Sequence, residues 1–125
     1  MRGPVGLWAP VAAWMALIFS VSAMSAPPGA RLAPDWATHA LVYAALAALL
    51  ARALAGGVRR AALATLLLAA SLATVYGVTD EWHQMYVPQR QSEVRDVVND
   101  MIGAGLGAGA FALLAALLPG PRRRA

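Results

Sequence analysis

Two histidines in this sequence lie near carboxylic acids at helical spacing, and they are its first candidates for chemistry. Asp35 precedes His39 by four residues, and Asp80 precedes His83 by three. Residues three or four apart share one face of an α-helix, so each pair can orient a ligand or move a proton together. Glu81, which follows Asp80, points in another direction around the helix. We therefore take His39, Asp80 and His83 as candidate catalytic residues.

Other polar residues extend this chemistry. Tyr43 and Gln84 continue the two histidine-bearing faces, and two acids further along the chain are again four residues apart. Arg90 and Arg95 stand among acids, and they either pair with those acids or bind an anionic group such as a phosphate headgroup. The candidate ligand-binding residues are thus Asp35, Tyr43, Gln84, Arg90, Arg95, Asp96 and Asp100.

A divalent metal is the less favoured use of these groups. Imidazole and carboxylate can hold zinc or a harder divalent ion. The ligands would be His39, His83 and Asp80 with either Asp35 or Asp100. However, Asp80 and His83 lack the second helical histidine of the H-E-x-x-H motif. The cofactor therefore stays unassigned, and an interhelical hydrogen-bond network that only fixes the fold is an open alternative.

The elements that position these residues must be membrane helices. The chain is 60% hydrophobic and 13% charged, whereas soluble domains carry about 25% charged residues. About 18 or more consecutive apolar residues can cross a bilayer. The sequence predicts one all-α domain over residues 1–125, a bundle of four transmembrane helices followed by a basic cytoplasmic tail at 119–125. The helices are expected at about 4–24, 36–55, 59–84 and 92–118.

The first apolar segment has a competing interpretation. Arg2, the apolar stretch and SVSAMSA also fit a cleavable signal peptide. The apolar stretch is about 20 residues long, however, whereas a signal peptide has about 7 to 15. We expect a retained helix, bent at Pro10.

The arginines predict the orientation of the bundle. Four spans place both chain ends and the 52–60 connection on one side, with seven of the ten arginines. The other side carries three arginines, all six acids and both histidines. Because cytoplasmic loops are enriched in basic residues, we expect cytoplasmic termini and a polar site at the extracytoplasmic face of a bacterial inner membrane.

Three stretches together resemble the VanZ-like family of small bacterial membrane proteins. They are Asp35, His39 and Tyr43, then TDEWHQMYVPQR at 79–90, and DVVNDMIGAGLG at 96–107. The family often has Lys at Trp36, Gly at Gln89 and Asn at Asp100. The resemblance implies the fold and the membrane location more than any chemistry. It also adds residues to the site, namely Glu81, Tyr86, Pro88, Gly103 and Gly107.

The resemblance also suggests a cellular setting. The family takes its name from a member linked to low-level resistance to the glycopeptide teicoplanin. We therefore expect the outer polar site to bind or modify a lipid-linked component of the cell envelope, without deciding whether a reaction occurs. Nucleic acid is not an expected partner, because the arginines are scattered between apolar spans.

The alternative is a structural or partner-binding module, in which the polar residues only lock the bundle. Small residues four apart allow helices to approach closely, so another helix would dock on the glycines of the last span. These are Gly103, Gly105, Gly107 and Gly109. A transporter is less favoured, because no acid lies near the midplane of any span.

Overall fold

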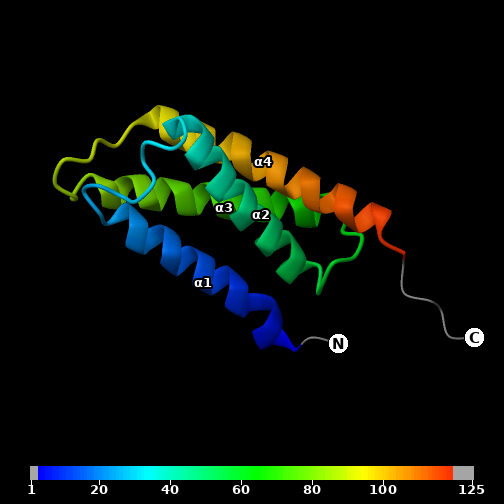
Figure 1. The fold of residues 1–125 in the computed structure, drawn as a ribbon. Coiled ribbons are helices and arrows are strands. Elements are labelled where there is room, and N and C mark those ends of the chain that lie inside the picture. The colour runs from blue at the N-terminus through cyan, green and yellow to red at the C-terminus, as the bar shows by residue number, and fades with distance from the viewer. Residues whose placement is uncertain (1–2, 120–125) are drawn as a thin grey trace, which may run out of the picture.

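The computed structural model describes residues 3–119 and shows four α-helices joined by short connections (Figure 1). All four are long and apolar enough to cross a membrane. The predicted all-α, four-helix fold is therefore confirmed. The predicted tail lies outside the described residues from residue 120 onward, as does Arg2. The helices are α1 (Pro4–Ser22), α2 (Asp35–Leu54), α3 (Leu63–Gln84) and α4 (Val94–Leu117).

The helix ends follow the local backbone. α1 runs unbroken through Pro10. α3 begins at Leu63, later than the predicted residue 59, because Gly56 and Gly57 adopt positive φ angles of 75° and 134° and turn the chain first. α4 begins after Glu93, which is extended.

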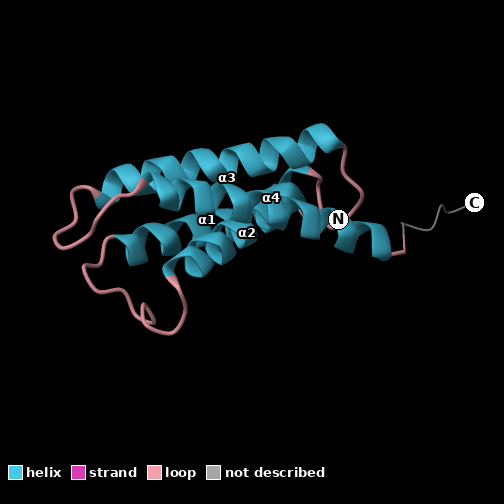
Figure 2. Ribbon diagram, turned by 90° about the horizontal axis from the view of Figure 1, so that it is seen from above, coloured by secondary structure: helices cyan, strands magenta, loops and turns pink. Residues whose placement is uncertain are grey.

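The connections lie at two opposite ends of the bundle. Residues 23–34 and 85–93 form the loops at one end, and residues 55–62 join α2 to α3 at the other (Figure 1). The view from above shows the same two long loops side by side beyond the helix ends (Figure 2). The start of α2, the end of α3 and the start of α4, which carry the predicted site residues, thus meet at one end.

Two glycines bring α2 and α4 into backbone contact. A Cβ atom at Gly103 would overlap the carbonyl oxygen of Ala40, and one at Gly107 would overlap that of Ala44. Small residues at a helix interface permit this closeness. Gly103 and Gly107 therefore pack within the chain, and only Gly105 and Gly109 of the four glycines remain exposed.

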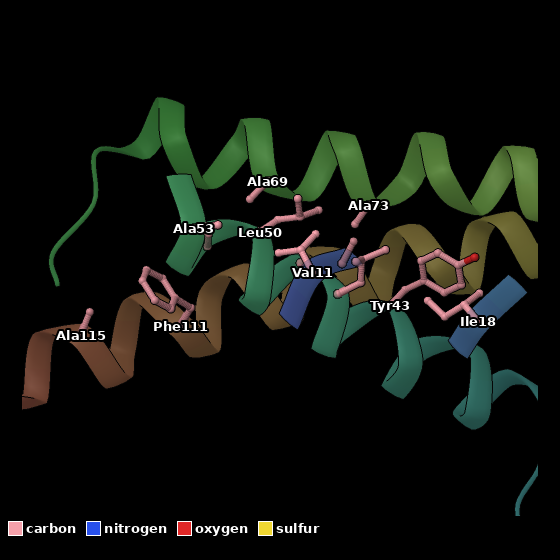
Figure 3. Close-up of a cluster of buried hydrophobic side chains, with 13 residues drawn as sticks. Val11, Ile18, Tyr43, Leu50, Ala53, Ala69, Ala73, Phe111 and Ala115 are labelled. Carbon is pink, nitrogen blue, oxygen red and sulfur yellow. The ribbon is translucent and has the colours of Figure 1, made fainter. Parts of the chain in front are cut away.

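A narrow apolar core runs along the bundle, largely made of alanines with a few larger side chains (Figure 3). Many large apolar side chains face outward instead, among them Leu41 and Leu106, which are 73% and 66% exposed. Such an outer surface suits lipid, whereas a soluble monomer rarely exposes a large contiguous apolar patch. The labelled core residues are Val11, Ile18, Tyr43, Leu50, Ala53, Ala69, Ala73, Phe111 and Ala115.

Helix α1 packs on α2 and α3 and, among the described residues, does not contact α4. Two hydrogen bonds tie it to these neighbours. Trp14 Nε1 donates to the carbonyl oxygen of Val42 at 3.0 Å, and the Tyr76 hydroxyl donates to that of Met15 at 2.7 Å. They fix the first helix against the wall of the site.

Candidate functional site

The polar residues at the loop end form two clusters, one around His39 and one around Asp80. The first, which we call the His39 cluster, consists of His39, Glu81 and Asp100, one residue from each of α2, α3 and α4. His39 Nδ1 lies 2.8 Å from Asp100 Oδ1, and its Nε2 lies 3.9 Å from Asp35 Oδ1. The glycine contact of α2 with α4 positions this pair, because Gly103 lies one helical turn beyond Asp100.

Glu81 completes the His39 cluster. Its direction around α3 differs from that of Asp80, as predicted, but it is buried, with only 3% of its surface exposed. Glu81 Oε2 accepts a hydrogen bond from the backbone N–H of Glu93 at 3.3 Å. One possible ligand atom from each of the three residues lies within 4.8 Å of the other two. The cluster thus has a small, acidic interior.

The second cluster, which we call the Asp80 cluster, consists of Ser22, Asp80, His83 and Gln84. Asp80 accepts hydrogen bonds from Ser22 Oγ at 2.5 Å and from Gln84 Nε2 at 3.2 Å. His83 Nδ1 lies 3.3 Å from Ser22 Oγ, and its ring stacks on that of Phe19 with centroids 4.4 Å apart. Because the single hydroxyl proton goes to Asp80, the contact with Nδ1 requires that His83 be the donor there.

The Asp80 cluster is not a catalytic triad of the serine-hydrolase type. In such a triad the carboxylate orients the histidine, and the histidine takes the proton of the serine. Here Asp80 binds Ser22 directly. The arrangement can hold a ligand and exchange protons with it, but Ser22 is not set up as a nucleophile.

Arg90 connects the 85–93 loop to the Asp80 cluster. Its NH2 donates to Gln84 Oε1 at 3.0 Å, and Gln84 in turn donates to Asp80. Among the described residues, Arg90 makes no salt bridge, whereas Arg95 pairs with Glu93 at 3.0 Å on the surface. Of the two arginines predicted to pair with acids or to bind an anion, Arg90 thus keeps its charge available.

A pocket of about 490 Å³ lies beside the Asp80 cluster, between α1 and α2. Trp14, Leu17 and Val42 line the part furthest from the loops. The polar residues of the pocket lie in the part nearest the loops. They are Ser22, His39, Asp80, Gln84 and Arg90, and the largely apolar residues 25–30 of the first loop lie beside them.

Tyr43 also lines this pocket, and its side chain is 2% exposed. Its hydroxyl has no hydrogen-bond partner among the described residues. Buried polar groups are nearly always paired, so an unpaired hydroxyl at a pocket wall is a candidate contact for a bound molecule. Figure 3 shows Tyr43 next to Ile18, with its oxygen at the tip of the ring.

Comparison with known protein families agrees with this architecture. Residues 7–115 match the family model described as VanZ/LLP1, which therefore extends from α1 to α4. The chain belongs to the VanZ/LLP1 family. No curated protein and no solved structure matches it. The resemblance seen in residues 35–107 is thus confirmed for almost the whole chain.

The predicted site residues of this VanZ/LLP1 protein gather at one end but divide between the two clusters. His39, Asp100 and Glu81 lie together, while Gln84 is hydrogen-bonded to Asp80, and Ser22 links Asp80 to His83. A smaller pocket of about 380 Å³ adjoins the first group. It is lined by the predicted site residues Asp35, Arg95 and Asp96 and by Trp36 and Asn99.

Sequence reasoning missed Ser22, which is buried and contacts both Asp80 and His83 in this VanZ/LLP1 protein. Nothing in the pattern singles it out, because it ends an apolar helix and has no polar neighbour at helical spacing within that helix. The unusual backbone conformation of Gln89, in contrast, could have been predicted from the sequence. This residue adopts a φ of 64°, a left-handed conformation that favours glycine, where the VanZ-like pattern often has one.

Proposed function

We propose that this VanZ/LLP1 protein is a multi-pass protein of the bacterial inner membrane that binds an amphiphilic component of the cell envelope. The ligand enters the pocket between α1 and α2 with its apolar part against Trp14, Leu17 and Val42. Its anionic headgroup meets Arg90. A lipid-linked wall precursor has this chemistry, and binding one would connect the protein to glycopeptide sensitivity.

The observation that carries the proposal is the polarity gradient of the pocket. Between Asp35 and Val42, α2 advances by about 10 Å at the helical rise of about 1.5 Å per residue. Over that length the lining changes from carboxylate and imidazole to apolar side chains. A fully polar metabolite would not match the apolar part of the pocket, and a plain hydrocarbon would leave the polar groups of the other part without partners.

The orientation that we propose for the protein in the membrane follows from the distribution of its arginines. The end with the loops 23–34 and 85–93 carries three of the ten arginines, whereas the other seven belong to the two terminal segments and to residues 52–60. The positive-inside rule assigns the arginine-rich end to the cytoplasm. The pocket then opens at the extracytoplasmic face, where wall precursors are used.

Proton transfer is the chemistry that the pocket can add to binding. Asp80 and His83 are joined through Ser22, and His39 lines the same pocket. In the proposal these three residues orient the headgroup and exchange protons with it. Whether bonds in the ligand change is the question that an activity assay must address.

A second candidate function is purely structural. Asp80 receives hydrogen bonds from α1 and from its own helix, so the Asp80 cluster also ties two helices together. Buried polar residues in membrane proteins often act in this way. In that case the exposed face with Gly105 and Gly109 would dock a partner helix.

Native mass spectrometry of the purified protein tests ligand binding. We expect the wild type to retain an anionic amphiphile, and Arg90→Gln to lose most of it. Arg31→Gln is the matched control, because Arg31 lies in the neighbouring loop and does not line the pocket. A wild type without bound amphiphile, or equal losses in both variants, would support the structural alternative.

Single cysteines test the orientation independently, because the chain has none of its own. A cysteine at the exposed Gln91 should react with an impermeant thiol reagent added outside intact cells. A cysteine at Val58, in the opposite loop, should react only after the membrane is opened. The reverse pattern would place the pocket in the cytoplasm and contradict the proposal.

A further inference from the structure

The His39 cluster takes no part in the ligand pocket except through His39 itself. It lies on the α4 side of α3 and is almost wholly buried. Glu81 is 3% exposed and Asp100 is 1% exposed. We propose that His39, Glu81 and Asp100 bind one divalent transition-metal ion of the Mn²⁺ or Zn²⁺ class.

Each of the two buried carboxylates has one oxygen that is bonded and one that is not. Glu81 Oε2 accepts from the backbone of Glu93, and Asp100 Oδ1 contacts His39. Glu81 Oε1 and Asp100 Oδ2 have no hydrogen-bond partner among the described residues. Burying a carboxylate oxygen without a partner is costly, and a cation within the cluster would offset that cost.

The spacing suits a single ion. Ligands at about 2.0–2.2 Å from a tetrahedral zinc lie about 3.3–3.6 Å apart, and in an octahedral site at the same bond length adjacent ligands lie about 3 Å and opposite ones about 4.4 Å apart. The ligand atoms of the cluster lie within 4.8 Å of one another. The 2.8 Å between His39 Nδ1 and Asp100 Oδ1 is close to the adjacent-ligand distance. On binding, the ion would take the place of the proton that His39 Nδ1 and Asp100 Oδ1 share in this hydrogen bond.

Three helices hold the ligands in place. Gly77 allows Asp100 to lie directly against α3, and the backbone contact at Gly103 holds α4 against α2. Asp96 lies one turn from Asp100 and forms a further close group with Asp35 and His39. It can supply an additional carboxylate when the ion needs more ligands.

The donor set points to the class of metal. One imidazole with two or three carboxylates suits Mn²⁺, Fe²⁺ or Zn²⁺, whereas soft ions such as Cu⁺ prefer sulfur ligands, which cysteine would supply. On the sequence alone a metal is disfavoured, because Asp80 and His83 lack the second helical histidine of the H-E-x-x-H motif. Among the described residues, the groups close enough to share an ion contain His39 and not His83.

Titration of the chelator-treated, detergent-purified protein with Mn²⁺, followed by electron paramagnetic resonance of the free ion, tests the proposal. We expect about one Mn²⁺ per chain, displaced by Zn²⁺. Glu81→Gln and Asp100→Asn should each weaken Mn²⁺ binding by about tenfold or more. Asp80→Asn, the neighbouring buried acid of the other cluster, is the comparison and should weaken Mn²⁺ binding far less than either ligand variant, because Asp80 is not among the grouped ligands.

Two outcomes would overturn the metal site. One is a wild type that binds no Mn²⁺ or Zn²⁺, which needs no variant to be decisive. The other is equal loss in Asp80→Asn and Glu81→Gln. If Asp100→Asn does not fold, the thermal midpoint of the wild type with and without Mn²⁺ still tests the site. An ion that binds only the native state must raise that midpoint. The proposal stands independently of lipid binding in the pocket.

Discussion

Gly77 on α3 faces the carboxylate of Asp100 on α4, and a Cβ atom at Gly77 would lie 2.7 Å from Asp100 Oδ2. No side chain larger than hydrogen fits there unless Asp100 moves. Because Asp100 also contacts His39, this one glycine fixes the geometry of the whole His39 cluster.

Gly77→Ala should therefore displace Asp100. Overpacking of this kind costs about 1–3 kcal/mol, so we expect a lower thermal midpoint in detergent and weaker Mn²⁺ binding. Gly105→Ala is the control, because nothing lies within 4 Å of the added methyl group. Unchanged stability and unchanged Mn²⁺ binding in Gly77→Ala would show that Asp100 is not held as described.

The four glycines of α4 should divide into two pairs. Gly103→Ala and Gly107→Ala would overlap the α2 backbone, so each should destabilise the bundle by about 1–3 kcal/mol. Gly109→Ala has no neighbour within 4 Å and should be neutral or stabilising, because alanine favours helix over glycine. Thermal unfolding measures both. If Gly109→Ala were instead the more damaging change, the exposed face would be a partner interface.

Tyr43→Phe and Tyr76→Phe should have opposite effects on folding. The Tyr43 hydroxyl has no partner among the described residues, so its removal should leave stability unchanged or raise it, while weakening amphiphile binding. The Tyr76 hydroxyl donates to Met15, so its removal should cost about 1 kcal/mol. A large loss of stability in Tyr43→Phe would contradict a ligand role for that hydroxyl.

Ser22→Ala should loosen α1 from α3. It removes a donor from the buried Asp80, at a cost of about 1–3 kcal/mol. Ser20→Ala is the matched change, because exposed Ser20 bonds only to Ala16 within its own helix. Equal unfolding midpoints for the two variants would mean that the contact with Asp80 contributes nothing to stability.

Gln89→Gly should stabilise the 85–93 loop. A residue other than glycine at a φ of 64° is strained by about 1 kcal/mol or more. Relieving it should raise the thermal midpoint without changing the charge of the site. Gln91→Gly, two residues further along the exposed loop, should show no such gain.

The sequence predicts the fold well because hydropathy alone determines it. Four apolar stretches of membrane length leave few other arrangements. The face shared by Asp35 and His39 also follows from spacing, as does the separate direction of Glu81. The spacing of residues along one helix does not show which other helix each of its faces contacts. The partners of Asp80 and Glu81 depend on how α3 packs against α1 and α4, and that depends on Gly77, Gly103 and Gly107, which carry no charge and lie outside the charged motif at 79–84.

Asp80 and Glu81 are consecutive residues whose side chains point about 100° apart around one helix and belong to different clusters. Their backbone positions are rigidly linked, so any turn of α3 about its own axis moves both carboxylates in the same rotational sense. An ion bound by Glu81 that turned α3 would therefore also move Asp80 in the wall of the pocket. A difference in Mn²⁺ affinity between the amphiphile-loaded and the amphiphile-free protein would measure such coupling.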